Sequence, residues 1–504
     1  MSQPHTRPNI LFIVSDQMVA ALTGVYGHPV VQTPHLERLA ERGVRFEAAY
    51  TPFPLCAPGR ACFMTGRHAS AIGAWDNGAL LPADQPTFAD YLTKAGYDTV
   101  LSGKMHFIGP EQQHGFRMRL NTDIYPADFT WVRPEWIGLK ETKGEDYETV
   151  MSQRPAYNAA GYTGDGVKID VWHNALSYDE ETHFRALEYL RARGRQPDQG
   201  PFMLCASYHH PHEPFWPPQE YWDLYEGAEI ELPHFPDNLD ETYSMMDRNL
   251  NAYHGTRRFN LRDPEGLYRL RRAYYGLVTY MDRKVGELLD ALEETGLADN
   301  TVVIFASDHG DMLGEKEMVQ KRCFYEWSCR VPLLVAFPDG WKAGTTYQAP
   351  VSLLDLLPTF NDLAGLSNPL PHDGVSLISL LQTEQPERIV YAQAHEAVGM
   401  PCIMARQGGY KYNYIHGHQP QLFDLRADPG EWHNLAHEPA HQATARQLQE
   451  AILANFDPEA MAVENLASLH RRALIRDTLL SHGRTWAHFP QFDARQGASD
   501  QYLP

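Results

Sequence analysis

The stretch NILFIVSDQ, residues 9–17, decides the fold, because it is almost continuously apolar and then ends in polar residues. Runs of the same kind recur at YDTVLSG (97–103), FMLCASY (202–208), TVVIFASD (301–308) and VPLLVAF (331–337). Helical patterns such as LERLAERG, which starts two residues after Pro34, separate them. Apolar runs spaced by helices are typical of parallel strands covered on both faces. The sequence therefore predicts a doubly wound α/β domain with a mostly parallel sheet.

Three of these runs end directly in residues that can do chemistry. They are SDQ at 15–17, GKMH at 103–106 and SDHGD at 307–311. In doubly wound folds, ligands gather at the carboxyl ends of the strands. The shared placement predicts that the three segments contribute to one site.

The sequence pattern changes after about residue 370. RIVYAQAHE (388–396), CIMARQGGYKYNYI (402–415) and QLFDLRADP (421–429) are typical of antiparallel strands, and a helix is expected around 440–455. We therefore expect a large α/β domain over 1–370, a smaller α+β domain over 371–460 and a C-terminal extension over 461–504. The extension is too apolar for a solvated tail, so we expect it to pack on the body or at a subunit interface of a homo-oligomer.

Composition excludes several classes of protein. The net charge of −21 repels nucleic acid, although simple solubility explains it equally well. No apolar run approaches the ~20 residues that span a bilayer, and the N-terminus lacks the features of a secretory signal, so we expect a cytoplasmic protein with no membrane partner. The six cysteines lack zinc-ligand spacing and are expected to be buried thiols of a reducing compartment, with one exception.

That exception is Cys56, which begins the sequence Cys-Ala-Pro-Gly-Arg ending at Arg60. Among six cysteines, an accidental C-x-P-x-R has a chance of roughly 0.02. An apolar-aromatic lead, YTPFPL, precedes the motif, and a helix-forming stretch, ACFMTGR, follows it. The thiol is therefore expected at a helix N-terminus, where backbone N–H groups favour an anion. The alternative is an inert buried cysteine beside a turn-forming proline.

In this motif and setting, the chain resembles the type I sulfatases of the alkaline phosphatase superfamily. The resemblance implies an alkaline-phosphatase-like fold and oxidation of Cys56 to formylglycine by a formylglycine-generating enzyme, a transient partner. The hydrated aldehyde supplies the nucleophilic hydroxyl in that family. A geminal diol can expel sulfate by collapsing back to the aldehyde, whereas a plain Ser or Cys would trap a sulfated enzyme.

The resemblance also implies a divalent metal held by Asp16, Cys56, Asp308 and His309. Two carboxylates brought together at strand ends repel each other unless a cation lies between them, although Asp after a strand also commonly caps a helix. The family usually has a second Asp and an Asn where this chain has Gln17 and His309. An imidazole ligand suits manganese better than calcium. The ion is thus expected to be Mn²⁺ or Ca²⁺, and whether Gln17 binds it stays open.

Further matches supply catalytic candidates. They are Lys104 and His106 in GKMH, His212 in HHPHEPF and Lys321 upstream of the Y-E…R-x-P element, together with Arg60. Cations suit a transferring group whose charge spreads over its non-bridging oxygens, and histidines suit proton transfer. Each residue alone is more commonly structural, but all of them follow the family's order along the chain.

A closer resemblance, over most of the chain, is to choline sulfatases. It implies that Asn77 lies near the sulfate group and that Trp131 and Glu396 could hold a quaternary ammonium group by cation–π contact and charge. Trp131 in the core and Glu396 on the surface is the alternative. The chain departs from this family at 484–504, where RTWAHFPQFDARQGASDQYLP has no W-D pair and Asp493 is displaced.

We therefore predict a sulfatase that hydrolyses a small-molecule sulfate monoester, with a small alkyl sulfate such as choline-O-sulfate as the favoured substrate. Rival interpretations are an aryl sulfatase and a phosphonate monoester or phosphodiester hydrolase of the same superfamily. A rival of another class is an inactive, sulfatase-like binding protein. Intact Cys56, Arg60, metal carboxylates and histidines oppose this last interpretation.

Overall fold

The central feature of the fold is a twisted, mostly parallel sheet of eight strands. The computed structural model describes residues 7–133, 135–141, 147, 151, 158–196, 199–367 and 370–483. In spatial order the strands are β5 (Met118–Arg119), β4 (Asp98–Gly103), β6 (Phe202–Pro211), β1 (Asn9–Asp16), β7 (Thr301–Ser307), β8 (Leu333–Ala336), β2 (Val44–Phe46) and β9 (Thr345–Tyr347). The five strands from β5 to β7 are parallel, and β8 runs antiparallel to both of its neighbours.

Strand β1 lies at the centre of the sheet. All eight of its residues are buried, and it pairs in parallel with β6 on one side and β7 on the other. Ile10, for example, lies opposite Met203 and Val302. A strand that is enclosed on both edges and both faces has an apolar middle. The run from Ile10 to Val14 is therefore continuously apolar and does not alternate with polar residues.

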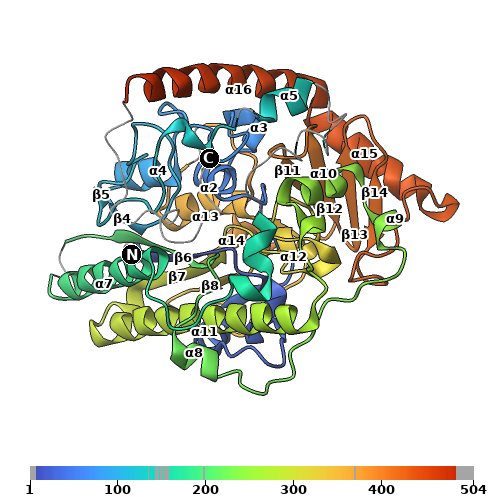
Figure 1. Ribbon diagram of the computed structural model, residues 1–504. Helices are drawn as coiled ribbons and strands as arrows, with labels where there is room; N and C mark the ends of the chain where they lie inside the picture. The colour runs from blue at the N-terminus through green and yellow to red at the C-terminus, as the bar shows by residue number, and fades with distance from the viewer. Residues whose placement is uncertain are drawn as a thin grey trace.

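Helices cover both faces of the sheet and enclose two cores (Figure 1). One face carries α1 (Pro34–Glu41), α7 (Asn174–Gly194), α8 (Gln219–Asp223) and the long α11 (Pro264–Glu294). The other carries α2 (Cys56–Thr65), α3 (Ala69–Ile72), α4 (Phe88–Lys94), α13 (Leu356–Leu363) and α14 (Leu377–Gln382). This arrangement confirms the predicted doubly wound α/β fold.

The C-terminal part forms a second, antiparallel sheet. Its strands, in order, are β11 (Val390–Ala394), β12 (Cys402–Gln407), β13 (Tyr410–Ile415) and β14 (Gln421–Asp424), and α15 (Gln442–Asn455) packs against it. A short parallel pair, β3 (Ala49–Tyr50) with β10 (Val351–Ser352), lies near the junction with the main body. The smaller α+β unit is thus confirmed as an antiparallel sheet with a helix.

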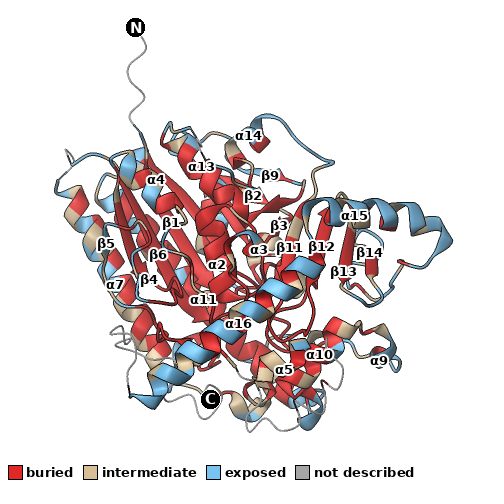
Figure 2. Cartoon of the chain, turned by 90° about the horizontal axis from the view of Figure 1, so that it is seen from above, coloured by how far each residue is buried: buried red, intermediate tan, exposed pale blue. Residues whose placement is uncertain are grey.

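Helix α16 (Pro458–Ser481) lies on the surface across the main body, next to α5 (Glu135–Glu141) (Figure 2). It crosses position 460, where we expect the small domain to give way to the extension, so that division stays a prediction. The segment 484–504, in which the W-D pair is missing, lies outside the described residues. The short helices α9 (Leu239–Thr242), α10 (Met245–His254) and α12 (Glu326–Cys329) lie in the connecting segments. None of the helices in the described ranges has the length and apolar composition needed to cross a membrane.

The strands β1, β4, β6 and β7 end at the same edge of the sheet, as the parallel topology requires. Gly103 ends β4 in a backbone conformation with φ of +106° that side chains rarely adopt. A Cβ atom at this position would lie 1.9 Å from the backbone oxygen of Ser207 in β6. The glycine therefore lets two strands approach each other directly beside Lys104.

We predict that Gly103→Ala destabilises the protein by at least about 3 kcal/mol, because it combines an unfavourable φ with a clash against backbone. Gly96→Ala is the matched control, since Gly96 has a φ of +91° but no atom within 4 Å of the added Cβ. It should lose only about 1–2 kcal/mol. Thermal unfolding midpoints of both variants test this, and equal decreases would contradict the proposed close approach.

Candidate active site

Cys56 is the first residue of α2, directly after Leu55 in extended conformation. Its side chain is buried, and the backbone N–H of Ala57 donates to Oδ1 of Asn77 at 3.1 Å. Burial, reinforced by the Asp16 carboxylate, raises the pKa of the Cys56 thiol to about 12. The unmodified thiol is therefore protonated at neutral pH and is a poor nucleophile, despite its place at a helix N-terminus.

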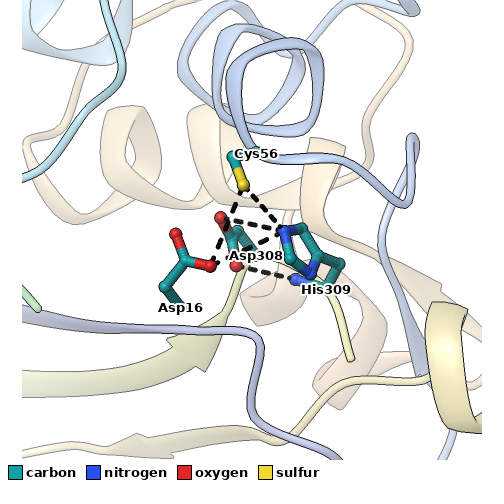
Figure 3. A group of neighbouring side chains, drawn as sticks. All are labelled: Asp16, Cys56, Asp308 and His309. Atoms are coloured by element: carbon teal, nitrogen blue, oxygen red, sulfur yellow. Dashed lines mark hydrogen bonds and ion pairs between the residues drawn. The ribbon is translucent and has the colours of Figure 1, made fainter. Parts of the chain in front are cut away.

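Asp16, Asp308 and His309 surround the thiol (Figure 3). One ligand atom from each of these residues and from Cys56 lies within 4.8 Å of all the others, and all four residues are buried. Oδ1 of Asp16 lies 3.7 Å from Nε2 of His309 and 3.9 Å from Sγ of Cys56. Strand ends about 300 residues apart in sequence therefore converge on one point, as the pattern of polar strand ends predicts.

The ring of His309 is oriented for metal binding. Its Nδ1 lies 3.0 Å from the backbone oxygen of Gly310, which can only accept, so Nδ1 carries the proton. The lone pair of Nε2 is left facing the carboxylates and Cys56. Burial lowers the pKa of His309 to about 4, so the imidazole is neutral. Two carboxylates and one neutral imidazole form a donor set that fits a divalent transition ion.

Arg60, on the first turns of α2, links both carboxylates. Its Nε donates to Oδ2 of Asp308 at 2.8 Å, and its Nη2 donates to Oδ2 of Asp16 at 3.0 Å. Nη1 donates to the backbone oxygen of Lys104 and to the hydroxyl of Ser207. The guanidinium is completely buried. Arg60 thus holds the anionic groups of the site in fixed positions.

Lys104 and His106 follow β4. Nζ of Lys104 lies 2.5 Å from Oδ2 of Asp16. Burial acts to raise the pKa of Asp16, but cations, Lys104 foremost, hold it well below its usual range. His106 packs against Tyr125 and Trp131, and within the described residues neither of its ring nitrogens has a hydrogen-bond partner. Burial, followed by the Lys104 charge, lowers the pKa of His106, so this imidazole is neutral and available as a base.

Lys321 and His212 form a hydrogen-bonded pair. Nζ of Lys321 lies 2.8 Å from Nε2 of His212, whose Nδ1 donates to the backbone oxygen of Glu213. Burial, followed by the Lys321 charge, lowers the pKa of His212 well below its usual range. Nε2 therefore carries a lone pair, and the proton between the two residues resides on Lys321.

Gln17 contacts this pair through its amide oxygen, which accepts a hydrogen bond from Lys321. Its amide nitrogen donates to Glu213 at 2.7 Å and to Asp311. Burial, followed by the Glu213 charge, raises the pKa of Asp311 to about 7. The side chain of Gln17 thus connects Lys321 to a buried cluster of acidic side chains. Sequence reasoning missed this cluster. Its members are Glu213 and Asp311, which stand within HHPHEPF and SDHGD but were not assigned a role, and Tyr162, which no motif marks.

A pocket opens from Cys56 and is lined by predicted site residues and by others that the sequence did not mark. The predicted lining residues are Cys56, Asn77, His106, Trp131, His212, Lys321 and Glu396. Trp131 contacts His106 and Tyr125 with its ring, and Glu396 is buried rather than on the surface. Glu396 forms an ion pair with Arg322, which also lines the pocket and which sequence reasoning missed.

The loop that carries Asn77 is attached to the C-terminal helix α16. Arg472 of α16 makes a two-pronged ion pair with Asp76, with N–O distances of 2.5 and 2.8 Å, and both side chains are buried. The next residue, Asn77, accepts from Ala57 with its side chain and donates its backbone N–H to Glu396. One ion pair therefore connects the C-terminal extension to the residue that borders Cys56.

Comparison with known proteins matches residues 8–366 to the family described as "Sulfatase" and residues 314–457 to "N-sulphoglucosamine sulphohydrolase, C-terminal". A choline-sulfatase of Rhizobium meliloti is 39% identical and aligns over 99% of this chain and 96% of its own. An arylsulfatase of Clostridium perfringens is 28% identical over 90% of this chain and 95% of its own. Among solved structures, a phosphonate monoester hydrolase from Silicibacter pomeroyi superposes with a TM-score of 0.70, at 25% identity, over 89% of this chain and 94% of that one.

We predict that Arg472→Met lowers stability by about 3–5 kcal/mol, because it leaves the Asp76 carboxylate buried without a cation. Arg471→Met, on the exposed side of the same helix, is the control and should change stability by no more than about 0.5 kcal/mol. The double variant Asp76→Asn/Arg472→Met should recover part of the loss, since it removes both charges. Thermal unfolding measures all three, and equal midpoints for the two single variants would contradict the prediction.

Proposed function

The chain belongs to the sulfatase family and is a sulfuric ester hydrolase; from this premise we propose that it hydrolyses the sulfate monoester of a small alkyl alcohol with a formylglycine formed from Cys56. The observation that carries the proposal is the convergence of Asp16, Asp308 and His309 on the cysteine of a C-x-P-x-R motif. The C-x-P-x-R motif supports a modified nucleophile, because the resemblance to type I sulfatases implies oxidation of its cysteine.

The residues present fit a divalent cation. Asp16, Asp308, His309 and the modified residue 56 would hold Mn²⁺ or Ca²⁺, which when bound acts as a Lewis acid toward a sulfate oxygen and the diol. Arg60 orients the two carboxylates, and Lys104 adds positive charge beside Asp16. Lys104 and Lys321 neutralise the charge that spreads over the non-bridging sulfate oxygens.

The chain's own residues would move the protons of the reaction. The formylglycine diol, when formed, would supply the hydroxyl that attacks sulfur, and the proton of that hydroxyl would pass to solvent. Lys321 would protonate His212, and His212 would give this proton to the alcohol oxygen as the bond from sulfur to that oxygen breaks. His106 would take the proton of the second hydroxyl as sulfate leaves and the aldehyde reforms. Once water has rehydrated the aldehyde and solvent has restored the protonation of these residues, the net reaction converts ester and water to alcohol, sulfate and one proton.

The identity of the alcohol is the finer part of the proposal. The choline-sulfatase relative makes choline-O-sulfate the first alkyl sulfate to test. The similarity of this chain to an arylsulfatase and to a phosphonate monoester hydrolase makes aryl sulfates and phosphonate monoesters the rival substrates. Lys104 and His106 favour sulfate esters, because the family resemblance assigns both residues to sulfatases. All six cysteines are free and buried, which supports a reducing, cytoplasmic location, and a homo-oligomeric state stays a prediction.

The first test is mass spectrometry of the peptide that contains residue 56, from protein coexpressed with a formylglycine-generating enzyme. We expect the lighter oxo-aldehyde form in place of the thiol. The metal-replete protein should turn over alkyl and aryl sulfates faster than phosphonate esters, and Cys56→Ala should abolish turnover. A fully modified protein without sulfatase activity would refute the proposal and favour an inactive binding protein.

The second test addresses the role of His212. His212→Ala should reduce kcat/KM for an alkyl sulfate by about 100-fold or more, because an alkoxide is a poor leaving group without general-acid help. The same variant should lose less than about tenfold on nitrophenyl sulfate, whose leaving group needs no proton. Equal losses on the two substrates would show that His212 is not the proton donor.

A further inference from the structure

The pocket beyond the reacting centre combines aromatic rings with one ion pair. Trp131, Tyr125 and Tyr253 line it, together with Arg322 and Glu396. Aromatic rings beside a carboxylate are the means by which proteins hold quaternary ammonium groups. Whether this pocket can attract a cation therefore depends on what its carboxylate and its rings already contact.

The carboxylate of Glu396 is already compensated. Its Oε1 lies 2.7 Å from Nη2 and 2.9 Å from Nε of Arg322, and its Oε2 accepts the backbone N–H of Asn77 at 2.8 Å. The side chains of Arg322 and Glu396 are only 7% and 2% exposed, so little solvent screens the pair. Both oxygens have donors, and the pair as a whole carries no net charge.

Two of the three rings also lie beside the protein's own cations. The guanidinium carbon of Arg322 lies 5.5 Å from the centroid of the Tyr253 ring. Nζ of Lys104 lies 4.5 Å from the centroid of Tyr125, and that ring contacts Trp131 edge-on. Two of the rings in the pocket thus already have a fixed positive charge beside them.

The backbone holds Arg322 in place. Its φ is +85°, in the left-handed region that few residues other than glycine adopt, and Gln320 has a φ of +58°. The N–H of Arg322 donates to the backbone oxygen of Pro54, two residues before Cys56, and its Nη1 donates to Oε1 of Gln320 at 2.6 Å. A strained residue persists only where its surroundings determine it, and such positions cluster at functional sites.

We propose that Arg322 is a specificity-determining residue that makes the pocket select a small uncharged alcohol and disfavour a quaternary ammonium group. The inference rests on the proposed function and deepens it. A cation in the pocket would meet the buried guanidinium of Arg322, while the attraction of Glu396 is cancelled within the ion pair. A pocket that is buried and carries no net charge cannot compensate a quaternary ammonium group for the water that it leaves, so the pocket discriminates between charged and neutral substrates of equal shape.

The experiment compares two isosteric esters on modified, metal-replete protein. Choline-O-sulfate and 3,3-dimethylbutyl sulfate differ only in a charged nitrogen against a neutral carbon. We expect the wild-type protein to have a kcat/KM at least about tenfold higher for the neutral ester. This comparison needs no variant, and a wild-type preference for choline-O-sulfate would overturn the proposal.

Two variants separate charge from shape. Arg322→Gln should shift the ratio of the two kcat/KM values at least about tenfold toward choline-O-sulfate, because Glu396 then lacks its counter-ion. Arg322→Lys loses the two-pronged contact but keeps the positive charge, so it should retain the wild-type ratio. An equal shift in both variants, or no shift in either, would overturn the proposal, because a merely structural role would not distinguish them.

Nitrophenyl sulfate serves as the reference substrate for each preparation and reports the fraction of active, modified enzyme. If the modified protein hydrolyses nitrophenyl sulfate but prefers the choline ester, the proposed function stands and the role of Arg322 falls. If it hydrolyses none of the sulfate esters, the proposed function itself falls, and the inference falls with it.

Discussion

The fold and the site both depend on the buried guanidinium of Arg60. Four of its N–H groups donate to Asp16 at the end of β1, Asp308 after β7, the backbone oxygen of Lys104 after β4 and the hydroxyl of Ser207 in β6. These are four adjacent strands of the central sheet. A planar, always-charged donor suits this place, because two fully buried carboxylates need compensation in fixed directions. The same contacts set the position of Cys56, four residues earlier on α2.

The ionisable residues around Arg60 fall into two groups, neutral histidines and positively charged side chains. His106, His212 and His309 are all neutral because they are buried, whereas positive charge resides on Arg60, Lys104 and Lys321. Neutral imidazoles can accept protons or bind a cation, and lysines can supply protons or bind an anion. Burial thus assigns these roles to a small number of residues, and Gln17 joins one of these lysines to the acidic groups behind it.

Much of this arrangement could be predicted from the sequence. The apolar run at 9–16 and its polar ending identify a central strand and one edge of the sheet, and C-x-P-x-R identifies the start of α2. Residues at strand ends could be assigned to one site because parallel topology brings such ends together. The residues that were missed, among them Glu213, Asp311 and Arg322, lie in connecting segments with no periodic pattern. Glu213 and Asp311 stand within HHPHEPF and SDHGD, but their partner Gln17 is distant in sequence, as Asp76 is from Arg472, so no local signal predicts these contacts.

The ion pair between Arg472 and Asp76 has a consequence for the order of events during synthesis. Cys56 is only 1% exposed in the folded chain, so the oxidation proposed for it would have to occur before the protein closes. The helix that carries Arg472 leaves the ribosome long after Cys56. At about 5–20 residues per second, the delay is roughly 20–80 s. The position of this arginine near the end of the chain therefore leaves an interval during synthesis in which Asp76, beside the residue that borders Cys56, lacks its partner.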